Sequence, residues 1–294
     1  MNNSNKKFIF AVYIIYRIKS QMRTMDSTVG LSRNYLEKYL STVRSQGRYT
    51  FTLEELKEKF DLPNTSINQS LSRLKKKGDV AQIRKGFYAI IPPEYSKQGM
   101  LPHSLFIGDL MKSLNKPYYV ALLSAAAIYG AAHQQPMEYF VITETPAPRS
   151  IVNKKLKIIF LSKNDWAQDG ITQQKTNAGY LNVSLPELTA LDLFAYNHKV
   201  GTNRIVTVLQ ELADEMKTTV LTKIAKGYAN TAAIQRLGYV LEIELLQEKL
   251  ADNLWKVLSQ RNYFPIPLSP QKEKKGDSDN RWKVVINMEI ESDL

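Results

Sequence analysis

The sequence predicts a helix-rich α+β protein, with a small basic N-terminal domain followed by a larger mixed α/β domain. The chain has 294 residues, of which 44% are hydrophobic and 23% charged, as expected for a globular protein of about two domains. Residues 1–95 hold 17 of the 40 Lys and Arg but only 8 of the 28 Asp and Glu, so they carry +9 of the net charge of +12. This asymmetry favours a polyanionic partner for the N-terminal domain.

The chain contains no cysteine. Disulfides, iron–sulfur clusters, thiolate zinc sites and cysteine nucleophiles are therefore excluded, and a reducing compartment, the cytoplasm, is expected. Residues 1–29 are set apart as an N-terminal extension. Their apolar run, residues 8–16, is too short to span a membrane, and Arg17 and Lys19 stand where a signal peptide would need small residues. We expect an ordinary leader segment, or an extension upstream of a start at Met22 or Met25.

The first domain, residues 30–91, is expected to begin with two helices. Apolar side chains recur at helical spacing over residues 31–43, which predicts a supporting helix. Thr52 and Glu55 then have the spacing of a capping box, in which the Thr hydroxyl accepts from the backbone of Glu55 while the carboxylate reaches back. The box predicts a short helix through Lys59 that buries Leu56.

A third helix is expected from a cap at Thr65 or Ser66 to about residue 77, where Gly78 closes it. Three apolar residues at i, i+4 and i+7 share one face and are expected to pack inward: Ile67, Leu71 and Leu74. The polar residues that this leaves outside are Ser66, Asn68, Gln69, Ser72, Arg73, Lys75 and Lys76.

The outward face of this third helix contains no acidic residue. Short polar side chains near its N-terminal end can reach base edges, and the cations at its C-terminal end can hold phosphates, as in a recognition helix. A solvated helix whose lysines complement the helix macrodipole is the alternative interpretation.

Residues 80–91 alternate loosely and carry Arg84, Lys85 and Gly86 at their centre, which predicts two strands joined by a basic glycine turn. A capped helix, a turn, a polar-basic helix and a basic hairpin in this order predict a winged helix-turn-helix that binds DNA. We expect Arg84 and Lys85 to neutralise phosphates, and we count Tyr88 among the contact residues. A winged helix that makes only protein contacts is the alternative.

Prolines and a glycine in residues 92–102 indicate a linker, so the second domain occupies residues 103–294. Ser184 and Glu187 form a second capping box, which predicts a helix over residues 188–197. The other expected helices cover residues 104–114, 117–130, 205–216, 219–228, 232–246 and 249–258. Segments rich in Val, Ile, Phe and Tyr predict strands at residues 138–143, 156–161, 180–183 and 282–290. The sheet is therefore expected to combine distant parts of the chain.

Five segments follow the winged helix in a distinctive order. They are Tyr-Val-Ala-Leu-Leu-Ser-Ala-Ala-Ala-Ile-Tyr-Gly at 119–130, His-Gln-Gln-Pro at 133–136, Ser-Leu-Pro-Glu-Leu-Thr-Ala-Leu-Asp at 184–192, Gln-Arg-Leu-Gly-Tyr at 235–239 and Arg-Trp-Lys-Val-Val-Ile-Asn at 281–287. Through this order, from about residue 31 to residue 294, the chain resembles the AbiEi antitoxins of bacterial abortive-infection systems.

The resemblance implies a DNA-binding antitoxin that represses its own operon, a type IV toxin–antitoxin operon of phage defence. Paired protomers would bind an inverted-repeat operator in double-stranded DNA. The C-terminal domain, residues 103–294, would counteract a nucleotidyltransferase-like toxin encoded beside it. No cofactor and no membrane partner are expected.

The sequence offers little for catalysis. His133 has no Cys, second His or spaced carboxylates nearby, and such a lone histidine is usually a hydrogen-bonded structural group. Asp165, Asp169 and Asp192 are scattered, and the Gly-Ser turn and paired Asp of a nucleotidyltransferase are not found, so the chain is not expected to be the toxin. Phosphate-binding, dinucleotide, zinc-protease and nucleophile-elbow motifs are also missing. We expect a protein that is not an enzyme, without catalytic residues or a metal site.

Two other functions stay open. A catalytic C-terminal domain that modifies the toxin or a nucleotide would turn over at substoichiometric amounts. A winged-helix regulator with an unrelated ligand-sensing domain would change its operator affinity with a small molecule.

Overall fold

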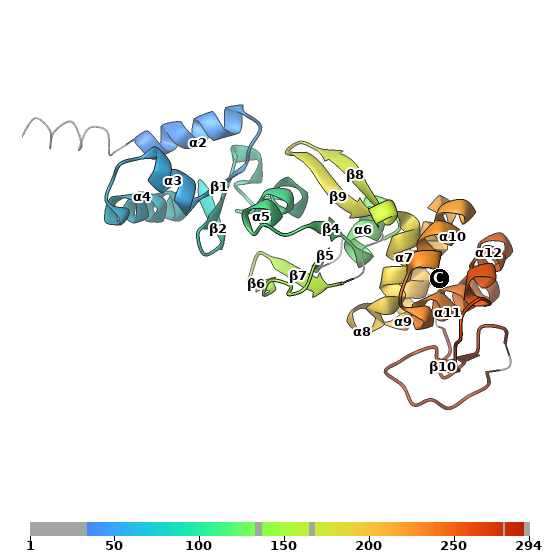
Figure 1. Cartoon of the computed structure of the whole chain (residues 1–294). Helices are drawn as coiled ribbons and strands as arrows, with labels where there is room; N and C mark the ends of the chain where they lie inside the picture. The colour runs from blue at the N-terminus through green and yellow to red at the C-terminus, as the bar shows by residue number, and fades with distance from the viewer. Residues whose placement is uncertain (1–33, 133–136, 165–167, 279, 291–294) are drawn as a thin grey trace, which may run out of the picture. The chain divides into compact units, whose positions relative to one another are not determined.

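The computed structural model describes residues 34–132, 137–164, 168–278 and 280–290. The chain divides into two compact units, Met1–Pro102 and His103–Leu294 (Figure 1). Both units mix helices and strands, which confirms the expected α+β class. Within the described ranges no helix is long and apolar enough to cross a membrane.

The first unit has its elements in the order helix, strand, helix, helix, strand, strand, which is the order of a winged helix-turn-helix. Its three strands pair antiparallel in the order β1-β3-β2. A 3₁₀ turn, η1 (Pro93–Tyr95), follows them. The elements are α2 (Tyr35–Ser45), β1 (Thr50–Thr52), α3 (Leu53–Lys59), α4 (Asn64–Lys77), β2 (Val80–Arg84) and β3 (Phe87–Ile90).

The core of this unit lies between its helices and one face of its sheet. Phe51, Leu56 and Ile67 are fully buried there, and Leu71 and Leu74 join them from α4. The expected inward face of α4 and the burial of Leu56 are therefore confirmed. Burying such apolar side chains is the main favourable term that holds three short helices on a three-stranded sheet.

The caps of α3 and α4 agree only in part with those predicted from the sequence. Thr52 Oγ1 accepts from the backbone N–H of Glu55 at 3.0 Å, as expected, but the Glu55 carboxylate accepts from Arg48 at 2.9 Å instead of reaching back. The expected cap of α4 at Thr65 or Ser66 is wrong, because the helix begins at Asn64. Its cap residue is Pro63, whose φ of −55° starts the first turn without a side-chain bond. Gly78, at φ 85°, closes α4 as expected.

The second unit is built on a six-stranded sheet of order β6-β7-β5-β4-β9-β8. The pairs β5·β7 and β4·β9 are parallel, and the other pairs are antiparallel. The strands are β4 (Tyr118–Val120), β5 (Tyr139–Thr143), β6 (Ile151–Val152), β7 (Lys157–Ser162), β8 (Ile171–Thr176) and β9 (Gly179–Ser184). The segments that accompany them are η2 (His103–Leu105), α5 (Ile107–Ser113), α6 (Leu122–Ile128) and η3 (Gln168–Gly170).

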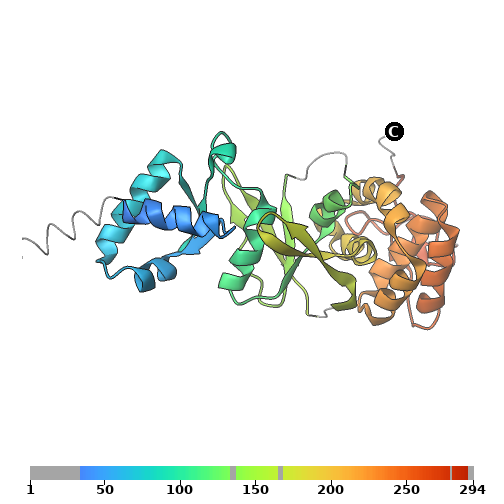
Figure 2. The same cartoon turned by 90° about the horizontal axis from the view of Figure 1, so that it is seen from above.

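Helices form the rest of the second unit. The helix α7 (Pro186–Ala195) lies at the centre of this region (Figure 2). It packs against α6, α9 (Thr202–Leu212), α10 (Thr218–Gly227) and α11 (Thr231–Tyr239), and all but its last residue are buried. The helices that surround it or follow it are α8 (Asn197–Val200), α9 (Thr202–Leu212), η4 (Ala213–Glu215), α10 (Thr218–Gly227), α11 (Thr231–Tyr239), the π-helix η5 (Val240–Glu244) and α12 (Glu248–Leu258). A short parallel ladder joins β10 (Ile266–Pro267) to β11 (Val284–Val285).

Residues 117–130 do not form the single helix that the sequence predicts. Tyr118, Tyr119 and Val120 form β4 instead, which pairs with β5 on one side and β9 on the other. The helix α6 begins only after Ala121, whose backbone is extended. Aromatic and β-branched side chains favour a strand. Because both edges of β4 are paired with neighbouring strands, residues 118–120 form a strand and not the first turn of a helix. Gly130, at φ 79°, follows the helix end.

The strand predicted at residues 282–290 is also wrong. Only Val284 and Val285 form a ladder there, and they pair with β10 outside the main sheet. Conversely, the sheet contains β6 and β8, which the sequence did not predict. Each pairs with one other strand, at an edge of the sheet. The strand β6 has only two residues and β8 reads Ile-Thr-Gln-Gln-Lys-Thr, so neither has the long apolar run that marks a central strand.

The capping box expected at Ser184 is absent, because α7 begins at Pro186 with Leu185 as its cap residue. The Ser184 hydroxyl lies within hydrogen-bonding distance of Thr189 Oγ1, at 2.6 Å. The Glu187 carboxylate accepts from the backbone N–H of Lys217, at 2.6 Å. Both polar groups thus connect segments of the second unit, while the proline supplies the preformed first turn of α7.

Candidate nucleic-acid interface

The helix α4 presents most of the predicted contact residues to solvent. Asn68, Gln69, Ser72, Lys75 and Lys76 are exposed, as is Arg73, while Ser66 is half-buried. No carboxylate lies on this helix. The exposed face of α4 is therefore polar along its whole length and cationic toward its C-terminal end, from Arg73 onward.

The helical period of 3.6 residues divides this face into three stripes. Thr65, Gln69, Ser72 and Lys76 lie opposite the buried stripe of Ile67, Leu71 and Leu74. One flank carries Asn68 and Lys75, and the other carries Ser66, Arg73 and Lys77. Thr65 is an additional candidate contact residue, because it is exposed and stands one turn before Gln69 on the same stripe. The sequence had suggested only a capping role for it.

Side chains on the two flanks of α4 bind to different neighbouring elements, β2 on one side and α2 on the other. Lys75 Nζ donates to the side-chain oxygen of Gln82 on β2, at 3.1 Å, so the flank with Asn68 lies beside the hairpin. Lys77 Nζ forms an ion pair with Glu37 on α2, at 2.9 Å, so the opposite flank lies beside α2. Arg73 on that flank donates to Ser70 Oγ at 3.2 Å.

The hairpin turn between β2 and β3 presents Lys85, which is exposed. Gly86 has φ 80°, a conformation that suits glycine, and its carbonyl accepts from the backbone N–H of Leu53 at 2.8 Å. The turn is thus fixed to the start of α3. One carboxylate oxygen of Glu54 lies 3.7 Å from where a Cβ on Gly86 would stand, so a negative charge accompanies the cation of the turn.

Tyr88 and Arg84 do not share this exposure. Tyr88 is 6% exposed and its ring stacks on Phe51, with the centroids 5.4 Å apart, so it belongs to the core of the first unit. Arg84 is half-buried, and its Nη1 atom is buried without a hydrogen-bond partner among the described residues. An irregularity in the ladder between Gln82 and Arg84 sets Arg84 opposite Phe87. Such a bulge turns a side chain toward the other face of a sheet.

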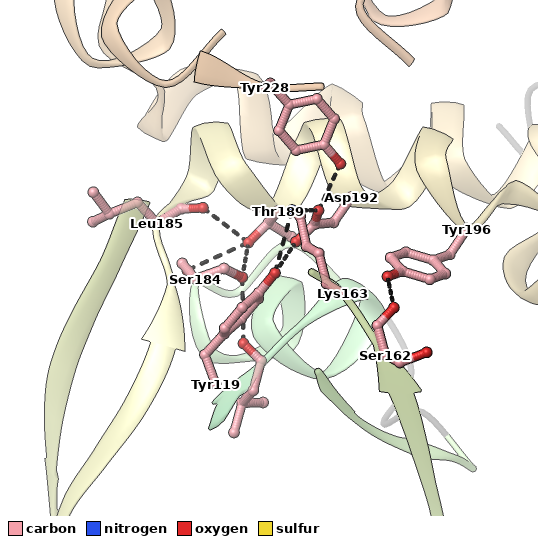
Figure 3. A network of polar contacts seen from close by, with 10 residues as sticks. Tyr119, Ser162, Lys163, Ser184, Leu185, Thr189, Asp192, Tyr196 and Tyr228 are labelled. Atoms are coloured by element: carbon pink, nitrogen blue, oxygen red, sulfur yellow. Dashed lines mark hydrogen bonds and ion pairs between the residues drawn. The ribbon is translucent and has the colours of Figure 1, made fainter. Parts of the chain in front are cut away.

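A buried polar network lies in the second unit, around Asp192 of α7 (Figure 3). Its carboxylate accepts from Tyr119 at 2.8 Å and from Tyr228 at 2.7 Å, and it forms an ion pair with Lys163 at 2.6 Å. Lys163 Nζ also lies 4.3 Å from the centroid of the Tyr228 ring. Asp192 is fully buried and the Lys163 side chain is 14% exposed, so the two charges compensate each other away from water.

Burial, reinforced by the Asp192 carboxylate, raises the pKa of Tyr119 and of Tyr228 well above the usual value. Both hydroxyls therefore stay protonated and donate to Asp192. A pocket beside Lys163 is lined in part by Ser162, Tyr196 and Asn230. Raised pKa values next to a pocket can mark a catalytic site, but here each of the three donors is already bonded to the carboxylate. The network mainly ties β4, the end of β7, α7 and the end of α10 together.

The other polar residues that could have formed a site either have structural partners or lie outside the described part of the chain. His133 and Asp165 lie outside the described residues. Asp169 forms an exposed ion pair with Lys223 at 3.0 Å, and the Ser124 hydroxyl accepts from the backbone N–H of Phe140 at 2.9 Å. The described residues contain no group of three His, Asp or Glu side chains that could hold a metal ion.

Comparisons with known proteins agree with this division of the chain. A family model described as "Transcriptional regulator, AbiEi antitoxin" matches residues 37–91, and one described as "AbiEi antitoxin C-terminal domain" matches residues 119–243. The crystal structure of the RV2827C protein from Mycobacterium tuberculosis is similar with a TM-score of 0.62 and 16% identity, over 86% of this chain and 91% of that one. This likeness concerns the fold alone. The search of curated proteins gave no match.

Proposed function

Since this chain belongs to the AbiEi antitoxin family, with a regulator domain and an antitoxin domain, we propose that its first unit binds duplex DNA and represses its own operon. The observation that carries this proposal is the face of α4. It is exposed and free of carboxylates, and it lies beside a hairpin turn that exposes Lys85. Polar side chains followed by lysines on one helix suit the edges of bases and the phosphates next to them.

The proposed division of work follows the stripes of α4. Asn68, Gln69 and Ser72 read base edges in the major groove, and Lys75, Lys76 and Lys85 hold phosphates. Ser66 and Arg73 lie on the flank beside α2 and would contact the border of the bound site. Arg84 contributes only if its half-buried side chain turns outward on binding. Tyr88 is left out because it is buried.

Two protomers on an inverted repeat would double these contacts. A winged helix contacts one half-site, and palindromic operators mirror a two-fold pair of proteins. We infer that the two protomers pair either on the DNA or before they bind it. This takes place in the cytoplasm, where the operon is transcribed.

The second unit, in this proposal, counteracts a nucleotidyltransferase-like toxin encoded beside it, without catalysis. The match of residues 119–243 to an AbiEi C-terminal domain supports an antitoxin role for this unit. Co-expression with the neighbouring gene tests it: growth should be restored by the second unit alone, His103–Leu294, if neutralisation needs no DNA binding.

The DNA-binding proposal is tested by gel shift on the region upstream of the gene. The double variant Gln69→Ala with Lys76→Ala should lose most of the binding, since it removes a base contact and a phosphate contact from the central stripe. Lys77→Ala is the matched control, because Lys77 is already paired with Glu37. Binding by the double variant as tight as that of the unmodified chain would show that this surface is misassigned.

One observation favours a second candidate, a catalytic second unit. Lys163, the partner of the buried Asp192, lines a pocket at the carboxyl end of β7, which pairs parallel with β5. In open parallel sheets, ligands often bind at the carboxyl ends of the strands. Toxin neutralised by far less than one equivalent of this chain would favour catalysis. Neutralisation that stops at one equivalent would exclude it.

A further inference from the structure

Gln82 joins the recognition helix to the hairpin. Its side-chain oxygen accepts from Lys75 Nζ at 3.1 Å, and its side-chain nitrogen donates to the backbone carbonyl of Arg84 at 3.4 Å. An ammonium group can only donate, so the amide oxygen has to face Lys75 and the nitrogen is left for the hairpin. One side chain thus links the C-terminal turn of α4 to the residue before the hairpin turn.

Two of the three lysines at the end of α4, Lys75 and Lys77, have side-chain partners of different charge. Lys77 is paired with the carboxylate of Glu37 at 2.9 Å, which compensates its charge. Lys75 is held by a neutral amide, which orients the ammonium group and leaves its charge uncompensated. A cation that is held in place but not neutralised is suited to an incoming anion, whereas Lys77 would first have to leave its carboxylate.

We propose that Gln82 is a positioning residue for DNA binding, which holds Lys75 at the junction of helix and hairpin for a phosphate of the duplex backbone. This inference rests on the proposed function of the first unit. It adds a residue outside the recognition helix. It also selects Lys75, on the flank beside the hairpin, rather than Lys77, on the flank beside α2, as the lysine that contacts the backbone.

The expected effect is moderate and has a distinct signature. Ordering one long side chain in advance is worth about threefold to tenfold in affinity. Gln82→Ala should therefore weaken binding by about that factor, yet leave the dependence on salt unchanged, because Lys75 can still reach its phosphate. Gln82→Glu places a carboxylate of nearly the same shape beside Lys75. It should weaken binding and lower the slope of log affinity against log salt by up to about 0.9, the value of one neutralised phosphate.

The experiment measures fluorescence anisotropy of the full chain with a labelled duplex of unrelated sequence, over a series of NaCl concentrations. Phosphate contacts dominate such non-specific binding, so the operator sequence is not needed. Lys75→Met should lower the slope by about 0.9, and Gln82→Ala should have no further effect in that background. Lys77→Met serves as the matched control and should leave the slope unchanged. Thermal unfolding of each variant shows that the first unit is still folded.

The outcomes separate this inference from the proposed function. If the unmodified chain binds with a clear salt dependence and Gln82→Glu behaves in the same way, the role of Gln82 is refuted and DNA binding stands. An equal loss from Lys77→Met and Lys75→Met would refute the choice of flank. If the unmodified chain shows no salt-dependent binding to any duplex, both proposals fail.

Discussion

The indole ring of Trp282 lies against Gly238 of α11, so closely that a Cβ on residue 238 would fall inside van der Waals contact with three ring atoms. Trp282 is fully buried. Its Nε1 donates to the carboxylate of Glu242, and its carbonyl accepts from the side chain of Gln235 at 2.8 Å. The segment around Trp282 is therefore fastened by the ring and one hydrogen bond to α11, and by a second hydrogen bond to η5.

We predict that Gly238→Ala destabilises the second unit. Added volume in a packed core costs about 1–3 kcal/mol, and here both the ring and the helix are held by other bonds, so the upper part of that range is expected. Gly227→Ala is the control, because no atom lies within 4 Å of a Cβ built at that residue. Urea unfolding followed by tryptophan fluorescence measures both variants, and equal midpoints for them would contradict the prediction.

A second prediction concerns the buried ion pair. Lys163→Met leaves the Asp192 carboxylate without its cation, and breaking a buried pair from one side costs about 3–5 kcal/mol. Lys223→Met removes the same charge from the exposed pair with Asp169, which should cost less than about 1 kcal/mol. Chemical denaturation compares the two. A difference near zero would mean that the network contributes little to stability.

A third prediction concerns the negative charge beside the hairpin turn. Glu54 is exposed, and its carboxylate lies next to Gly86. We expect Glu54→Gln to tighten DNA binding by about twofold to fivefold at low salt, since a repulsion between this carboxylate and the phosphates is removed. Glu248→Gln, in the second unit, makes the same change in net charge. Anisotropy titrations on one duplex should show a gain for the first variant that the second does not share.

His103 gives the fourth prediction, on pH. Its ring stacks on Tyr139 with the centroids 4.5 Å apart, and burial lowers its pKa to about 4, below the usual 6.5. The folded state thus favours neutral His103. Its contribution is complete above pH 6.5 and is lost as the pH falls from 6.5 to 4, at most about 3 kcal/mol in all.

His103→Phe keeps an aromatic ring on Tyr139 but cannot be protonated. Between pH 7 and pH 5 the free energy of unfolding should therefore fall less for this variant than for the unmodified chain. Denaturation curves across that range measure the difference. Parallel pH profiles for the two proteins would show that His103 does not titrate as stated.

The sequence was sufficient where structure is decided locally. The inward face of α4, its end at Gly78 and the basic turn after β2 depend on neighbours a few residues away, and periodicity reveals them. Tyr88 was misjudged because an aromatic residue in a hairpin can face either side, and only the partner strand shows that it stacks on Phe51. Gln82 gave only a weak signal, because it is one of two polar residues that alternate with apolar ones in the strand Val-Ala-Gln-Ile-Arg.

Other features depend on residues too distant for any pattern. The carboxylate of Asp192 meets Tyr119 and Lys163, which precede it by 73 and 29 residues, and Tyr228, which follows by 36. In the sequence, Tyr119 and Tyr228 resemble ordinary core aromatics, and no local spacing marks them as partners of Asp192. Residues 117–130 had a helical pattern in sequence, and pairing with two strands that come later in the chain turned the first part into β4.

The position of Asp192 between partners on both sides also limits how this unit can be made. Because Tyr228 follows Asp192 by 36 residues, the carboxylate can have all its partners only after Tyr228 has been synthesised. A gene split anywhere between these residues would yield two fragments, each with a charged or polar group meant for the interior. We expect neither fragment to fold alone. The second unit should therefore be functional only when it is encoded and expressed as one uninterrupted chain.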